Sequence, residues 1–124
     1  MKENKIKVVS VEPGQPPVVK EIGNDLHSLQ AEVGGLIECI SFSNGCVAVC
    51  NEEGKLNGMP PNRRLGADII CGPFFVCDTS RSGDFSSLSK SKIAEYSKLF
   101  AEAPAFSGAE PELEPRMSFI AFDF

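Results

Sequence analysis

The stretch CVAVCNEEGKLNGMPPNRRLGADIICGPFFVC, residues 46–77, places two apolar runs on either side of a long polar segment. The two runs, Cys46–Cys50 and Ile69–Cys77, are typical of β-strands, and the first is apolar on both of its faces. A strand of that kind is covered on both sides, so we expect it near the centre of a sheet or at a subunit contact. Gly72-Pro73 interrupts the second run, and a bulge or bend is expected there because proline cannot donate to a β-ladder.

The polar segment between those runs, Cys50–Gly66, is long for a loop in a small domain, and such loops are usually either functional or disordered. Its prolines fix φ and its glycines permit turns with positive φ, which favours an ordered loop. We therefore interpret residues 51–66 as a shaped binding loop. Its candidate ligand-binding residues are Asn51, Glu52, Glu53, Lys55, Asn62, Arg63 and Arg64.

Two adjacent guanidiniums, Arg63 and Arg64, are the feature of this loop that points to a ligand. A guanidinium suits bidentate contact with phosphate and stacking on a nucleobase. The carboxamides of Asn51 and Asn62 can read the edge of a base or ribose. The alternative is that the arginines form ion pairs with glutamates of the same loop. The residues thus leave two interpretations open, a site for a nucleotide-like molecule and a loop held by internal bridges.

The two adjacent carboxylates, Glu52 and Glu53, point to opposite sides of an extended chain, so they form a poor acid–base pair by themselves. One of them could join Glu38 or Asp68 around a hard cation such as Mg²⁺. Alternatively, one accepts hydrogen bonds from backbone amides of the loop or pairs with an arginine. No motif for nucleophilic catalysis is visible, so we assign no catalytic residue, no cofactor and no metal site.

The rest of the chain predicts an α+β fold with a mixed, mainly antiparallel sheet covered on one face by two helices. The expected order is β-β-α-β-β-loop-β-α, followed by a C-terminal strand. Asn44-Gly45 is the strongest turn signal, because this dipeptide between two apolar runs is typical of a β-hairpin. The predicted organisation is a single domain over residues 1–103, an acidic proline-rich linker over 104–115, and an apolar strand or arm over 116–124.

Composition excludes several classes of protein. The chain has 124 residues and a net charge of −5, which fits one domain and argues against direct binding to nucleic acid, since phosphate contacts need a basic face. The N-terminus leads into a strand pattern rather than a signal peptide, and no apolar run is long enough to span a membrane, so we expect a cytoplasmic protein. The five cysteines are then expected to be reduced and buried, with zinc binding as the alternative.

Four short runs resemble a family met in bacteria, phages and conjugative elements and labelled domain of unknown function 3846. They are Val33-Gly-Gly-Leu-Ile-Glu-Cys39, Asn51-Glu-Glu-Gly-Lys55, Pro60-Pro-Asn-Arg63 and Asp68-Ile-Ile-Cys-Gly-Pro73, and the segment Val11-Glu-Pro-Gly-Gln-Pro-Pro17 fits as well. The resemblance covers roughly residues 5–100 and leaves out the acidic linker and the C-terminus.

The resemblance implies a phage or mobile-element context, in which small acidic proteins often counter host defence. The first expectation is a homo-oligomer that sequesters a nucleotide-derived immune signal, such as a cyclic dinucleotide or an ADP-ribose derivative, through the 51–66 loop. The alternative is an acidic decoy or inhibitor that binds a host defence protein or a nucleic-acid-binding protein. A third route is hydrolysis of the signal, with Glu52 or Glu53 as base or metal ligand.

Overall fold

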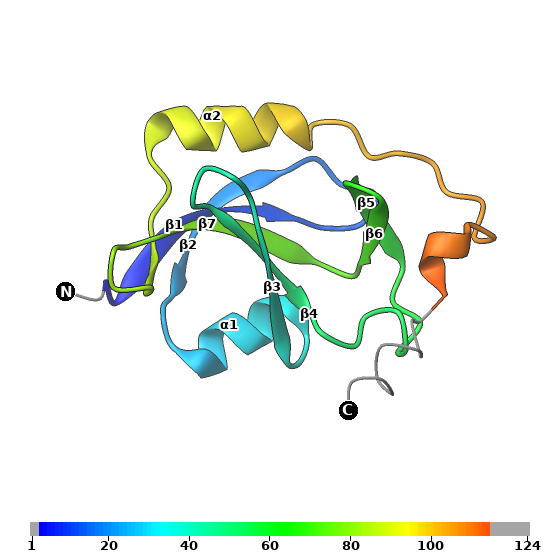
Figure 1. Cartoon of the computed structure of the whole chain (residues 1–124), viewed down its shortest axis with the longest axis horizontal. Coiled ribbons are helices and arrows are strands. Elements are labelled where there is room, and N and C mark those ends of the chain that lie inside the picture. Colours follow the sequence, from blue (N-terminus) through cyan, green and yellow to red (C-terminus); the bar gives the residue numbers. More distant parts are fainter. Residues whose placement is uncertain (1–2, 115–124) are drawn as a thin grey trace.

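The structure, a computed structural model, describes residues 3–114 (Figure 1). The predicted C-terminal strand over 116–124 lies outside the described residues. Within them the chain forms eight strands, two α-helices and one short 3₁₀ helix, which in order are β1 (Lys5–Val11), β2 (Val18–Gly23), α1 (Leu26–Val33), β3 (Ile37–Ser41), β4 (Val47–Asn51), β5 (Pro61–Leu65), β6 (Asp68–Cys71), β7 (Phe74–Thr79), β8 (Phe85–Ser86), α2 (Lys90–Leu99) and η1 (Pro111–Leu113).

Five of these strands lie side by side in the order β2-β1-β7-β4-β3, with β8 paired to β7 and with β5 and β6 forming a separate pair. All of the described pairings are antiparallel, and the predicted α+β class is confirmed. The Asn44-Gly45 turn joins β3 to β4 as expected, and Gly45 has a φ of 89°. β4 is buried along its whole length, in agreement with its uninterrupted apolar sequence.

The two helices cover opposite faces of the sheet (Figure 1), whereas the sequence led us to expect both on one face. Leu29 and Val33 of α1 pack with Ile6 and Val8 on one side. Tyr96 and Phe100, at and just past the end of α2, pack with alternate residues of β1 and with the β5–β6 pair on the other side. The central strands are apolar on both faces, so each face needs its own cover, and a one-sided arrangement would leave one face in water.

The helix boundaries follow from their capping residues. The carboxylate of Asp25 accepts a hydrogen bond from the Ser28 N–H at 2.8 Å, and Gly34 ends α1 with a φ of 81°. Asn24, the cap expected from the sequence, is instead buried and donates to the carbonyls of Glu3 and Phe85. Ser89 caps α2 as predicted.

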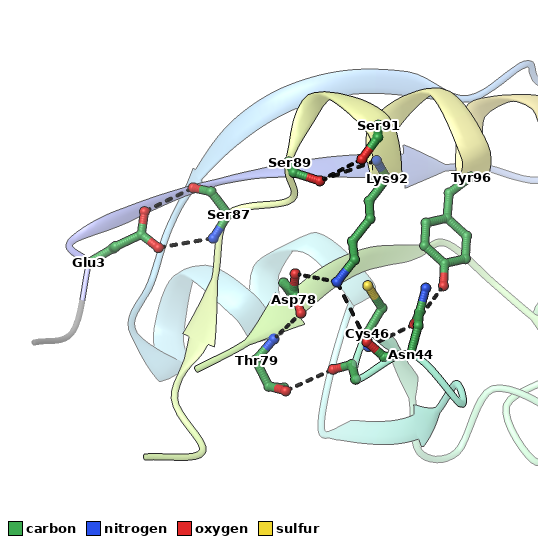
Figure 2. Close-up of polar contacts among 11 residues, drawn as sticks. Glu3, Asn44, Cys46, Asp78, Thr79, Ser87, Ser89, Ser91, Lys92 and Tyr96 are labelled. Atoms are coloured by element: carbon green, nitrogen blue, oxygen red, sulfur yellow. Dashed lines mark hydrogen bonds and ion pairs between the residues drawn. The ribbon is translucent and has the colours of Figure 1, made fainter. Parts of the chain in front are cut away.

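A polar network fastens α2 to the β3–β4 turn (Figure 2). The Lys92 ammonium lies 2.9 Å from a carboxylate oxygen of Asp78, and the Tyr96 hydroxyl donates to the Asn44 side-chain oxygen at 3.1 Å. Burial alone would raise the pKa of Asp78, but hydrogen bonds from Lys92 and from the Thr79 N–H lower the pKa overall. The network therefore holds a carboxylate in its charged form between a helix and a strand.

Candidate functional site

The segment between β4 and β6 is ordered, but its last part is a strand and not a loop. Residues 52–58 form successive turns, and Pro61–Leu65 then pairs as β5 with Asp68–Cys71. The turn between the two strands uses Gly66 with a φ of 62°. The loop expected from the sequence ran to residue 66, and the β5–β6 hairpin corrects that boundary. Proline is tolerated at the first position of a strand, which allows β5 to begin at Pro61.

The turns at residues 52–58 are held in place by contacts with the end of β4, the end of α1 and the end of β6. The buried Asn51 side chain donates to the Val33 carbonyl at 3.1 Å and accepts from the Glu53 N–H at 2.7 Å. Gly54 packs so closely that a Cβ atom there would lie 2.5 Å from the Cys71 carbonyl oxygen. These contacts give the segment a single shape and occupy both functional ends of the Asn51 carboxamide.

Asn62 and Arg63, two of the predicted ligand-binding residues, lie in the interior with exposed fractions of 1% and 3%. The Asn62 amide nitrogen donates to the carbonyls of Val11 and Gly72, both at 2.9 Å. Its side-chain oxygen accepts from Arg63 Nη1 at 2.9 Å. A ligand would have to open the fold to reach either side chain.

All five N–H donors of the Arg63 guanidinium are engaged inside the protein. Nε and Nη2 donate to the Phe100 carbonyl, Nη1 donates to the carbonyl and the side-chain oxygen of Asn62, and Nη2 also donates to the Gln15 carbonyl at 2.6 Å. These acceptors are neutral, and Phe100 closes the C-terminal end of α2, where the helix dipole favours a cation. Burial lowers the pKa of Arg63. Arg63 therefore joins β5, the β1–β2 turn and the end of α2.

The other two cations of the segment are paired with carboxylates. The Lys55 ammonium contacts Asp68 at the start of β6. Arg64, whose side chain is 51% exposed, lies 3.1 Å from a Glu112 oxygen, and its guanidinium is 5.9 Å from the centre of the Phe106 ring. The alternative expected from the sequence paired the arginines with glutamates of the same loop. The partners here are instead Asp68 of β6 and Glu112 of η1, which lie outside the 51–66 segment.

Two carboxylates of the segment face water and, unlike the half-exposed Arg64, have no ion-pair partner among the described residues. Glu52 and Glu53 are both exposed, and Glu52 donates its N–H to the Leu36 carbonyl beside β3. Burial raises the pKa of Glu38, and the nearby charges of Glu52 and Asp68 raise it further, against a smaller opposing effect of Lys55. Carboxylates thus lie near one another at this end of β3 and β4, with Lys55 as the cation that opposes their effect on Glu38.

Histidine and cysteine do not gather with these carboxylates. His27 is exposed on α1, Cys39 is exposed, and the other four cysteines are buried and free. Within residues 3–114 no group of three or more His, Cys, Asp or Glu side chains is arranged to hold a metal ion. Neither α-helix of that region has the length and apolar character needed to cross a membrane.

With this geometry in place, comparison with known proteins identifies the family. The family described as Domain of unknown function (DUF3846) matches residues 6–101. The chain belongs to this family. The resemblance seen in the four short sequence runs is thereby confirmed. No curated protein and no solved structure matches the chain.

Two features of this family member were missed from the sequence. The first is the structural role of Asn62 and Arg63, which a strict alternation of inward and outward residues does not predict. The β5–β6 register shifts between Pro61 and Arg63, so two consecutive side chains face the interior. The second is a group of polar side chains on the β1–β2 hairpin, Ser10, Glu12 and Gln15, which match no known sequence motif.

Proposed function

We propose that this protein is an acidic decoy or inhibitor that binds a basic partner, either a host defence protein or a nucleic-acid-binding protein, in the cytoplasm of the host cell. The observation that carries the proposal is which charged side chains of the 51–66 segment are buried or paired and which are exposed and unpaired. Arg63 is buried and saturated, and Lys55 and Arg64 are paired with carboxylates. Glu52 and Glu53 remain exposed to solvent.

The surrounding charges support a cationic partner. Burial and then the nearby charges of Glu52 and Asp68 raise the pKa of Glu38, as expected where carboxylates lie close together. The whole chain carries a net charge of −5. A negative surface attracts basic proteins over a distance and speeds their association. It repels the phosphates of a nucleotide unless cations remain free to meet them.

A second candidate function is the sequestration of a nucleotide-derived immune signal by a homo-oligomer. Arg64 favours it, because this guanidinium is half exposed and lies near the Phe106 ring. Arg64 would exchange its Glu112 partner for a phosphate, while Phe106 would offer a surface for a base. Of the two predicted arginine ligands, Arg64 is the one that a nucleotide could reach without opening the fold.

The two functions can be separated by one set of binding measurements on the full chain. The basic probe is a fluorescent, end-capped hexalysine peptide followed by anisotropy, and the nucleotide probes are a cyclic dinucleotide and ADP-ribose followed by thermal shift. The test variant is Glu52→Gln plus Glu53→Gln. We expect it to weaken hexalysine binding by about threefold or more at low salt, since exposed charge pairs contribute up to roughly 1 kcal/mol each.

The matched control is Glu21→Gln plus Glu95→Gln, which removes the same charge from exposed positions on β2 and α2. A smaller loss of affinity in the control supports a binding face at residues 52 and 53. Equal losses would mean that only net charge matters and would overturn the proposal. A melting-temperature rise with a nucleotide, abolished by Arg64→Ala and without hexalysine binding, would establish the sequestration function in its place.

A further inference from the structure

A shallow depression of about 240 Å³ lies on the β1–β2 hairpin. Its lining comes from the end of β1, the turn and the start of β2, and consists of Ser10, Glu12, Gln15, Pro16, Val18 and Lys20. Ser10 and Val18 lie directly opposite each other in the strand register, and Lys20 follows Val18 on the same face of β2. One hairpin therefore supplies the whole lining.

Three polar side chains of this depression have no hydrogen-bond partner in the described part of the chain. Ser10 is 9% exposed, and within residues 3–114 its hydroxyl has no hydrogen-bond partner. The carboxylate of Glu12 and the side-chain amide of Gln15 are likewise without partners among those residues. Buried polar groups normally have partners. The Ser10 hydroxyl can donate or accept, and the neighbouring Glu12 carboxylate, which only accepts, favours a ligand that brings donors.

The one cation in the lining is already neutralised. The Lys20 ammonium lies 2.7 Å from a carboxylate oxygen of Glu32 on α1. The depression therefore presents an unpaired carboxylate, a hydroxyl and an amide beside the apolar surfaces of Pro16 and Val18. This combination matches a long aliphatic side chain that ends in a positive charge.

The turn that carries these groups is held in a fixed position. The Gln15 N–H donates to the Glu12 carbonyl at 3.1 Å, and the Gln15 carbonyl accepts from the buried Arg63 guanidinium at 2.6 Å. A preorganised turn loses little freedom when a ligand binds. Arg63, which the sequence suggested as a direct ligand contact, thereby positions this depression from the interior.

We propose that the depression receives a lysine or arginine side chain of the basic partner, an inference that rests on the function proposed above. The methylene groups would lie on Pro16 and Val18, and the cationic head would donate to Glu12 and Ser10. The position agrees with the other acidic face. β1 and β4 both run antiparallel to β7, so the hairpin turn and residues 51–53 lie at the same end of the sheet.

The test is a titration of the ¹⁵N-labelled full chain with the end-capped hexalysine peptide, followed by backbone amide shifts. We expect shifts at Ser10, Glu12, Gln15 and Val18. Glu12→Gln should weaken the affinity by about threefold or more, as loss of one ion pair predicts. The matched control is Glu21→Gln, which removes one charge from an exposed position of the same hairpin on the opposite face of β2.

The outcomes separate this inference from the proposed function. If Glu12→Gln and Glu21→Gln weaken binding equally, or if the shifts lie away from residues 10–20, the depression does not receive the side chain. The Glu52→Gln plus Glu53→Gln variant then decides the proposed function independently. If Glu12→Gln weakens binding and the double variant does not, the basic partner binds at the hairpin alone. Absence of any hexalysine binding overturns both.

Discussion

Arg63 and Arg64 are neighbours of the same type with opposite roles. Arg63 is 3% exposed and saturated by carbonyl and amide oxygens, while Arg64 has a half-exposed side chain paired with Glu112. A buried acceptor that loses its donor costs about 1–3 kcal/mol, whereas an exposed ion pair contributes about 0–1 kcal/mol. Substitutions at these two positions therefore compare the contribution of a buried, structural arginine to stability with that of a surface arginine.

We expect Arg63→Lys to lower the free energy of unfolding by about 2–4 kcal/mol, because an ammonium has three donors and cannot reproduce the planar fork. Arg64→Lys should change it by less than about 1 kcal/mol. Urea denaturation of both variants measures the difference. Similar losses for the two variants would contradict the internal role of Arg63. Biological assays of Arg63→Ala must accordingly be read together with its stability.

Sequence reasoning could identify the chemistry of these residues but not their burial. An arginine pair in a polar, proline-rich segment is equally compatible with a surface site and with an interior brace, since both use the same donors. The decisive partners are the backbone carbonyls of Gln15 and Phe100. Every residue has a backbone carbonyl, so the sequence cannot show which of them accepts a hydrogen bond from Arg63. The sequence also gives no signal for the β-bulge that turns the side chains of Asn62 and Arg63 to the same side.

Among the elements, the turns before β5 depend on close backbone packing. Gly54 has no room for a side chain, because a Cβ atom would lie 2.5 Å from the Cys71 carbonyl oxygen. We expect Gly54→Ala to destabilise the protein by about 1–3 kcal/mol, as for other overpacked sites. The control in the same segment is Leu56→Ala, at a position that is 59% exposed, with an effect of about 0.5 kcal/mol or less. Thermal unfolding compares them, and equal effects would contradict this packing.

The elements that the sequence predicted well are those with strong local signals. The Asn44-Gly45 turn fixed the β3–β4 hairpin, and Gly72-Pro73 separates β6 from β7 as expected. β5 was missed because proline and asparagine are poor strand formers. Its position depends on tertiary contacts, which are the buried hydrogen bonds of Asn62 and Arg63 and the packing of Leu65 against the core beneath α2. The opposite placement of the helices was missed because apolar stripes do not say which face of a sheet they cover.

At the scale of the whole molecule, burial divides the five cysteines into two classes. Cys39 is exposed on the edge strand β3, while Cys46, Cys50, Cys71 and Cys77 are at most 5% exposed. Burial raises the pKa of all five thiols, Cys39 included, and raises that of Cys50 to about 12, so exposure rather than pKa separates the two classes. The reactivity of the thiols therefore reports on the integrity of both core layers.

We expect one thiol to react with a disulfide reagent such as 5,5′-dithiobis(2-nitrobenzoic acid) in the native protein at pH 8, and all five to react in urea. Absorbance of the released thiolate measures the count. Cys39→Ser should remove the native reaction without changing the stability. Rapid reaction of a second native thiol would contradict the packing of the sheet between its two covers.

The brace formed by Arg63 also bears on the order in which the chain can be completed during translation. All strands of the described region have been synthesised once the chain reaches Ser86. Two donors of the Arg63 guanidinium, however, bind the carbonyl of Phe100, which is made later. Before Phe100 has been synthesised, those donors lack their acceptor, and burying the guanidinium without it would leave them unpaired at a cost in free energy. We therefore expect the β5–β6 pair to reach its final packing only after α2 and its C-cap have been synthesised, close to the end of the matched residues 6–101.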